Sequence, residues 1–130
     1  MADLGASINV MSYSVFQTLN LGPLKETSVI IQLAYRSNAY PLGVVEDVLV
    51  QLGELIFPAD FYILDMEDSA FSSNSALILF GRPFLKTAKT KIDVDDGSLT
   101  MEFDGETGQV SFKCEGGEIC CCNLFNYLKK

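Results

Sequence analysis

The chain opens with Asp3-Leu4-Gly5-Ala6-Ser7, an Asp-x-Gly string that decides the fold when it is combined with Leu79-Phe80-Gly81 downstream. Taken alone, an Asp-x-Gly string is in most chains a surface turn, because these residues favour turns. Here an apolar-apolar-Gly string follows it at a spacing of roughly one small β-domain. Gly5 allows the loop to turn sharply and to approach another backbone closely. We expect Leu79-Phe80-Gly81 to pass behind the loop and to pack against it.

The bulk composition describes one globular domain with an acidic surface. A chain of 130 residues can bury a real core, and its 48% hydrophobic content is typical of a folded protein. The net charge is −8, from 17 acidic and 9 basic residues. This balance argues against nucleic acid and anionic membranes as partners, since both require a basic face. The simplest role of the acidity is solubility.

The two ends of the chain carry no targeting signal or metal site that we can identify. Met1-Ala2-Asp3 lacks a signal-peptide pattern, and no run of about 18 apolar residues occurs, so we expect an intracellular, cytoplasmic protein. The four cysteines are Cys114, Cys120, Cys121 and Cys122, which we expect to be reduced thiols. Three consecutive cysteines without any histidine fit a tetrahedral zinc site poorly. We predict no metal and no cofactor, a domain over residues 1–113, and a tail over 114–130 outside the core.

The first half of the chain predicts a short strand, a helix and then β-hairpins. An apolar strand at Ile8–Met11 leads to Ser12 as the N-cap of a helix, which Asn20, Gly22 and Pro23 end. Strands are then predicted from β-branched and apolar residues, with Gly43 marking a bulge or a close backbone approach. The predicted strands are Thr27–Leu33, Tyr40–Gln51 and Leu55–Leu64, with reversals at Ala34–Asn38 and Gly53-Glu54.

The second half predicts a loop, one buried strand, a brief helix and a meander. Asp65–Ser75 is polar and reads as a loop, Ala76–Phe80 is a short apolar strand, and Pro83 opens a brief helix after Gly81. The meander strands are Lys91–Val94, Leu99–Phe103 and Gln109–Phe112. Turn signals about every 8–12 residues are typical of an all-β sandwich or barrel.

The aspartate string suggests a specific chemistry. Peptide hydrolysis by two carboxylates requires a pair about 3 Å apart that shares one proton, because two like charges at that distance cannot both be ionised. One Asp-x-Gly string supplies only one of these carboxylates. A chain with a single such string therefore has to form a two-fold homodimer to complete the pair. Five further aspartates show no second motif around them and are expected to be solvated turn or edge carboxylates: Asp60, Asp65, Asp93, Asp95 and Asp96.

The wider sequence resembles the pepsin-like domain of plant gypsy-type retrotransposon polyproteins. The resemblance runs in consistent order over roughly Ala2 to Phe112, and it is carried by Asp3–Met11, Tyr13–Phe16, Tyr40–Val50 and Gly81–Leu85. It implies an all-β, retropepsin-like lobe, a small closed acid-protease barrel with one or two short helices. It also implies an aspartic-type endopeptidase that acts as a homodimer on peptide or polyprotein substrates.

The resemblance assigns roles to three groups of residues. Asp3 falls on the family's catalytic aspartate, within an active-site loop completed by Leu4, Gly5, Ala6 and Ser7. The loop-supporting string is Leu79, Phe80 and Gly81. A flap over the substrate falls on the predicted hairpin, with Ala34, Tyr35, Arg36, Ser37 and Tyr40 as the residues concerned.

Two departures from the family pattern keep alternatives open. Leu4 stands where the best-studied members carry Ser or Thr, whose hydroxyl stiffens the catalytic pair across the dimer. The family's lobe also begins with strands upstream of the aspartate, which we expect to be missing here, so that Asp3 lies near a fraying terminus. The alternatives are a catalytically inactive retrotransposon-derived fragment, and a peptide-binding or dimerisation module that keeps the fold.

Overall fold

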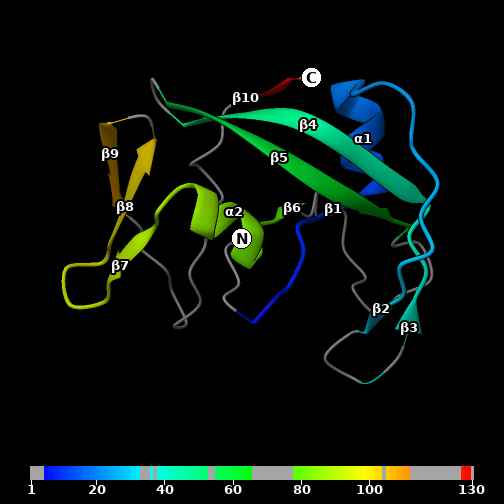
Figure 1. Ribbon diagram of the computed structural model, residues 1–130, viewed down its shortest axis with the longest axis horizontal. Helices are drawn as coiled ribbons and strands as arrows, with labels where there is room; N and C mark the ends of the chain where they lie inside the picture. The colour runs from blue at the N-terminus through cyan, green and yellow to red at the C-terminus, as the bar shows by residue number, and fades with distance from the viewer. Residues whose placement is uncertain are drawn as a thin grey trace.

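The computed structural model describes residues 5–32, 36, 38–52, 55–65, 78–103, 105–111 and 127–129. In this part of the chain, three sheets and two short helices surround one core (Figure 1). The main sheet has five strands in the order β10-β4-β5-β1-β6, and two smaller sheets pair β2 with β3 and β7 with β8 and β9. The all-β class is confirmed, while no sheet closes into a barrel among the described residues.

A long antiparallel hairpin of β4 (Gly43–Leu52) and β5 (Leu55–Leu64) forms the centre of the main sheet. Successive side chains of a strand point to opposite faces, so a strand with one buried face shows a period of two. Strand β5 follows this rule, with buried and exposed residues alternating through Pro58 and Asp60. Its inward residues form the floor of the core: Leu55, Phe57, Ala59, Phe61 and Ile63. The predicted strand Leu55–Leu64 is confirmed.

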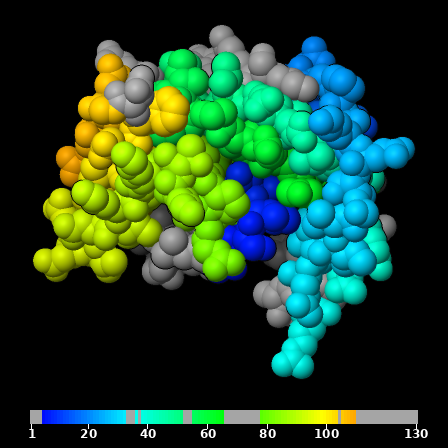
Figure 2. Space-filling model, viewed as in Figure 1, coloured from blue at the N-terminus to red at the C-terminus, as the bar shows by residue number. Residues whose placement is uncertain are grey.

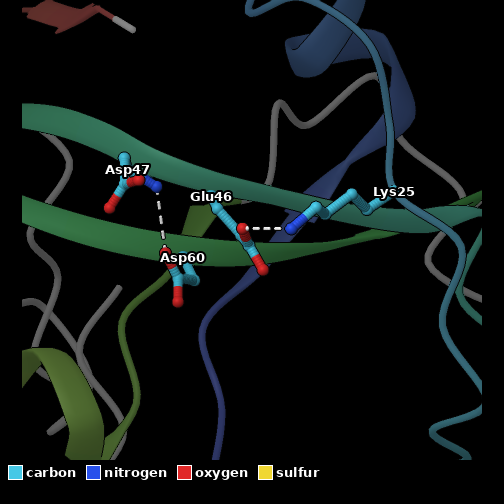
Figure 3. A network of polar contacts seen from close by, with 4 residues as sticks. All are labelled: Lys25, Glu46, Asp47 and Asp60. Carbon is cyan, nitrogen blue, oxygen red and sulfur yellow. Dashed lines mark hydrogen bonds and ion pairs between the residues drawn. The ribbon is translucent and has the colours of Figure 1, made fainter.

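The bulge in this hairpin lies beyond Gly43, between Val45 and Val48. Asp47 adopts a left-handed φ of 55° there, and its backbone N–H donates to the Asp60 carboxylate at 3.0 Å (Figure 3). At Gly43 the structure shows a close backbone approach, which was the second of the two features predicted for this residue. A Cβ on Gly43 would lie 2.7 Å from the carbonyl oxygen of Lys25, which is too close for any side chain.

Lys25 fastens the segment after the first helix to strand β4. Its backbone exchanges two hydrogen bonds with Val44, each of 2.9 Å. Its ammonium group donates to the Glu46 carboxylate at 2.8 Å, and Figure 3 shows this side chain reaching along the hairpin. The segment is therefore held at one point by both backbone and side chain.

The start of the described chain forms β1 (Val10–Ser12) and α1 (Tyr13–Leu19). Strand β1 is buried and lies parallel to β5 and antiparallel to β6 (Ile78–Leu79). Ser12 is the N-cap residue as predicted, but its hydroxyl pairs with that of Ser14 at 3.2 Å and caps no backbone N–H. Asn20 ends the helix in the left-handed conformation, with φ of 48°, which asparagine tolerates well.

A chain of phenylalanine rings joins the main sheet to α2 (Arg82–Thr87) and to β8 (Ser98–Phe103). Phe57 makes edge-to-face contacts with Phe84 and Phe103 at centroid distances of 5.6 and 5.3 Å. Phe80 contacts Phe61 at 5.7 Å and Phe84 at 4.5 Å. Aromatic pairs in this range add to the stabilisation that comes from area burial alone. The rings fix β6 and α2 beneath β5.

The remaining strands agree with the sequence in part. The meander is confirmed as β7 (Lys91–Asp93), β8 and β9 (Glu106–Ser111). Among the described residues, the predicted strand Thr27–Leu33 pairs over β2 (Ile31–Gln32) with β3 (Asn38–Ala39), while Val29 and Ile30 lie outside β2 and are exposed.

The tail contributes one element that the sequence did not predict. Strand β10 (Tyr127–Lys129) pairs with β4 at the edge of the main sheet, so part of the 114–130 segment joins the fold. The predictions for Gly53-Glu54, for most of the Asp65–Ser75 loop and for the cysteines lie outside the described residues. No helix in the described part of the chain is long and apolar enough to cross a membrane.

The ion pair between Lys25 and Glu46 should contribute to stability in a way that depends on pH. The hydrogen bond to Glu46 and the negative charge of this carboxylate hold the pKa of Lys25 above its ordinary value of 10.5. A raised lysine pKa contributes stability that is present below pH 10.5 and is lost as the pH rises through the folded-state pKa. Because both side chains are exposed, we expect this contribution to be small.

The substitution Glu46→Gln should lower the pKa of Lys25 towards its ordinary value, with Asp47 and Asp60 keeping a smaller influence. An NMR titration of the Lys25 side chain measures this directly. Glu102→Gln, at the separate pair with Lys89, is the control and should leave the Lys25 titration unchanged. An equal shift in both variants would contradict the assignment.

Candidate functional site

The described part of the candidate active-site loop consists of Gly5, Ala6 and Ser7, followed by Ile8. Gly5 and Ser7 are exposed, while Ala6 and Ile8 are half-buried. Figure 2 shows this dark blue segment on the floor of a hollow, between the yellow-green residues of α2 and the cyan segment that follows α1. Asp3 and Leu4 lie outside the described residues, so their predicted roles stay predictions.

Gly81 lies directly behind this loop. Strand β6 runs antiparallel to β1 with Leu79 opposite Val10, and the next residue, Phe80, is fully buried. A Cβ on Gly81 would collide with the carbonyl oxygen of Ile8 and lie 3.0 Å from that of Ala6. The backbone N–H of Arg82 donates to the Ala6 carbonyl at 2.9 Å. The loop and the Gly81 backbone are thus in contact with no room for a side chain between them.

Asn9 is a site residue that the sequence reasoning did not single out. It is only 4% exposed, and its side-chain oxygen accepts the Gly81 N–H at 2.8 Å. Its side-chain nitrogen donates to the Asp60 carbonyl at 3.1 Å, and its own carbonyl accepts the Tyr62 N–H at 3.0 Å. The available signal was a single amide side chain inside the otherwise apolar run Ile8–Met11.

The predicted flap corresponds to the β2–β3 hairpin. Ile31 pairs with Ala39 and Gln32 with Asn38, and Arg36 in the intervening turn has a left-handed φ of 60°. In Figure 1 the hairpin and the loop lie on the same side of the long strands β4 and β5. Tyr40 is 70% exposed at the end of the hairpin. The other predicted flap residues, Ala34, Tyr35 and Ser37, lie outside the described residues.

The face of α2 beside the loop carries a shallow, mainly apolar hollow with two basic side chains. Its lining residues are Ser7, Arg82, Pro83, Leu85, Lys86 and Thr90. Within the described ranges, no cluster of histidine, cysteine, aspartate or glutamate could hold a metal ion. The lining of this hollow offers hydroxyl groups from Ser7 and Thr90 and cationic groups from Arg82 and Lys86.

Comparison with known proteins identifies the fold. No family model matches the sequence, and no curated protein matches it. A solved structure does match: the crystal structure of the retroviral protease-like domain of Ddi1 from Leishmania major. The TM-score is 0.62 at 19% sequence identity, and the match covers 91% of this chain and 86% of that chain. The chain therefore shares the retropepsin-like fold over most of its length.

The contact of Gly81 with the loop predicts that even a methyl group is damaging there. In Gly81→Ala the new Cβ would meet backbone atoms of Ile8, which cannot move without displacing the loop. We expect a loss of about 3 kcal/mol in the free energy of unfolding, at the upper end of overpacking effects. Urea denaturation followed by circular dichroism measures it.

Gly108→Ala in β9 is the matched control. The Cβ there would lie 2.9 Å from Cδ1 of Leu55, a side-chain atom that can shift more readily than a backbone carbonyl. This variant should remain within about 1 kcal/mol of the wild type. If both glycine variants had the same stability, the close approach of Gly81 to the loop would be refuted.

Proposed function

We propose that this chain is one lobe of an aspartic-type endopeptidase of retrotransposon origin, whose active site forms between two copies. The observation that carries the proposal is the support of the 5–8 loop by Gly81 and Asn9. This contact fixes the backbone of residues 5–8, which follow Asp3 in the sequence, against the main sheet. A catalytic side chain needs placement within about half an ångström, which requires such a rigid support. The shared retropepsin-like fold is consistent with this role.

In the proposed mechanism, Asp3 from each copy forms a pair that shares one proton. The ionised carboxylate removes a proton from a water held between the two aspartates, and this water attacks the peptide carbonyl carbon. The protonated carboxyl donates its proton towards the carbonyl oxygen as negative charge develops there. Because the pair titrates as one unit, its apparent pKa values belong to the dyad, and activity requires a pH at which the two carboxyl groups share one proton.

The remaining site residues serve binding in this proposal. The β2–β3 hairpin closes over an extended peptide, with Tyr40 as an exposed side chain that can contact it. Leu4 supplies no hydroxyl to link the two loops, so their rigidity relies on the backbone contacts behind each loop. The proposed substrate is a peptide or polyprotein segment bound in extended conformation.

Leu4 also favours a second candidate function, an inactive lobe that binds peptides. Without a hydroxyl at this position the pair loses one constraint, while the hairpin and its exposed apolar neighbours would still bind an extended chain. These neighbours are Val29, Ile30, Tyr40 and Leu42. Peptide binding without cleavage, measured by calorimetry and chromatography of the products, would distinguish this function from the first.

The substitution Asp3→Asn tests the proposed enzyme. Removing the carboxylate should lower kcat/KM for a fluorogenic peptide at acidic pH by about 1,000-fold or more, because no general base remains. Pepstatin, which inhibits aspartic peptidases, should block the wild-type chain. Activity is measured alongside sedimentation equilibrium, which should show a dimer.

Asp96→Asn is the matched control, since it makes the same chemical change in an exposed turn. This variant should cleave the peptide as fast as the wild type. Turnover that survives in Asp3→Asn, or that is lost equally in both variants, would refute Asp3 as the catalytic group.

A further inference from the structure

We propose that Asn9 is the positioning residue of the loop to which Asp3 belongs. Its buried side-chain amide bonds the Gly81 N–H and the Asp60 carbonyl, an arrangement called the Asn9 clamp below, and so fixes the distance between the loop and the main sheet. The effect of Asn9 on catalysis rests on the proposed function. The position of Asn9 does not, because its hydrogen bonds to Gly81, Asp60 and Tyr62 join described residues.

The clamp connects three segments that lie far apart in sequence. Asn9 lies 51 residues from Asp60 and 72 residues from Gly81, yet one side chain bonds both. On one side its oxygen receives the Gly81 N–H, and on the other its nitrogen donates to the Asp60 carbonyl on β5. The loop residues Ala6 and Ile8 contact the same Gly81–Arg82 backbone. The position of the loop is thus tied through Asn9 to the central hairpin.

The chemistry of this position requires a donor and an acceptor on one short side chain. The Gly81 N–H can only donate and the Asp60 carbonyl can only accept, so the orientation of the amide is determined. A buried donor or acceptor left without its partner is unfavourable, whereas a residue that replaces both functions keeps the contacts. Aspartic acid in its protonated form offers both functions with nearly the same shape, while ionised aspartate offers only acceptors.

Among the residues that the structure describes, the elements near Asn9 carry few titratable side chains, and those on β4 are Glu46 and Asp47. From β5, the neighbouring titratable side chains are those of Asp60, which is exposed and accepts the Asp47 N–H, and of half-buried Tyr62. From α1 the titratable side chain is half-buried Tyr13, and from α2 it is exposed Arg82. Burial of a carboxyl group at position 9 would disfavour its ionised form. A substituted aspartate should therefore be neutral at the acid end of the activity profile and become ionised towards its upper end.

The variant Asn9→Asp gives a signature that a merely structural role would not produce. At low pH, where the new carboxyl is protonated, kcat should remain within about three-fold of the wild type, because both hydrogen bonds persist. As the pH rises through the pKa of this carboxyl, kcat relative to wild type should fall by about ten-fold or more, with KM unchanged. Asn9→Ala should show the reduced kcat at every pH.

Leu99→Ala controls for general destabilisation, since it removes a fully buried side chain from the three-stranded sheet and leaves the loop contacts intact. All variants are measured at a temperature where circular dichroism shows them folded. A flat ratio of kcat across pH for Asn9→Asp, or an equal fall of kcat in Leu99→Ala and Asn9→Ala, would overturn the proposal.

Amide hydrogen exchange provides a second readout that does not need activity. In Asn9→Ala the Gly81 and Arg82 amides should exchange at least about ten-fold faster than in wild type, while the amides of β8 and β9 keep their protection. In Leu99→Ala this order should be reversed. Unchanged exchange at Gly81 in Asn9→Ala would refute the clamp. If the wild type cleaves no peptide, the proposed function is refuted, while the exchange rates still test whether Asn9 holds the loop in place.

Discussion

The close contact between Gly81 and the backbone of Ile8 is the constraint that fixes the 5–8 loop against the main sheet. Two backbones can approach this closely only where one residue lacks a side chain, and a Cβ on Gly81 would overlap Ile8. The approach brings the Arg82 N–H to the Ala6 carbonyl and the Gly81 N–H to Asn9. An exposed loop at the start of the described chain thereby gains a rigid support.

Aromatic packing in the core holds the segments on both sides of Gly81. The rings of Phe61 and Phe80 fix the end of β6 beneath β5, and Phe84 anchors the helix that follows Gly81. On the other side of this contact, β1 lies between β5 and β6. Asn9 directly precedes β1 in the chain. The position of the loop therefore depends on the packing of β1, β5 and β6.

Local signals predicted much of this arrangement. The apolar residues of Leu55–Leu64, the stop at Asn20 and the proline after Gly81 each act within a few residues, and the observed elements agree with them. Features that depend on distant partners were not predictable. The β-branched residues Val29 and Ile30 fit a strand but lie outside the strands of the described chain, and β10 is recognised by its pairing with β4. Asn9 belongs to the same class, since its role depends on Gly81 and Asp60.

The central claim is that each chain supplies half of one active site, and mixed dimers test it most directly. Wild-type and Asp3→Asn chains are unfolded together, refolded at equal concentrations and assayed at a fixed total concentration. If both copies must contribute an aspartate, only dimers of two wild-type chains are active, and about one quarter of the wild-type activity remains. A remaining activity of about one half would mean that each chain works alone, and it would contradict the account.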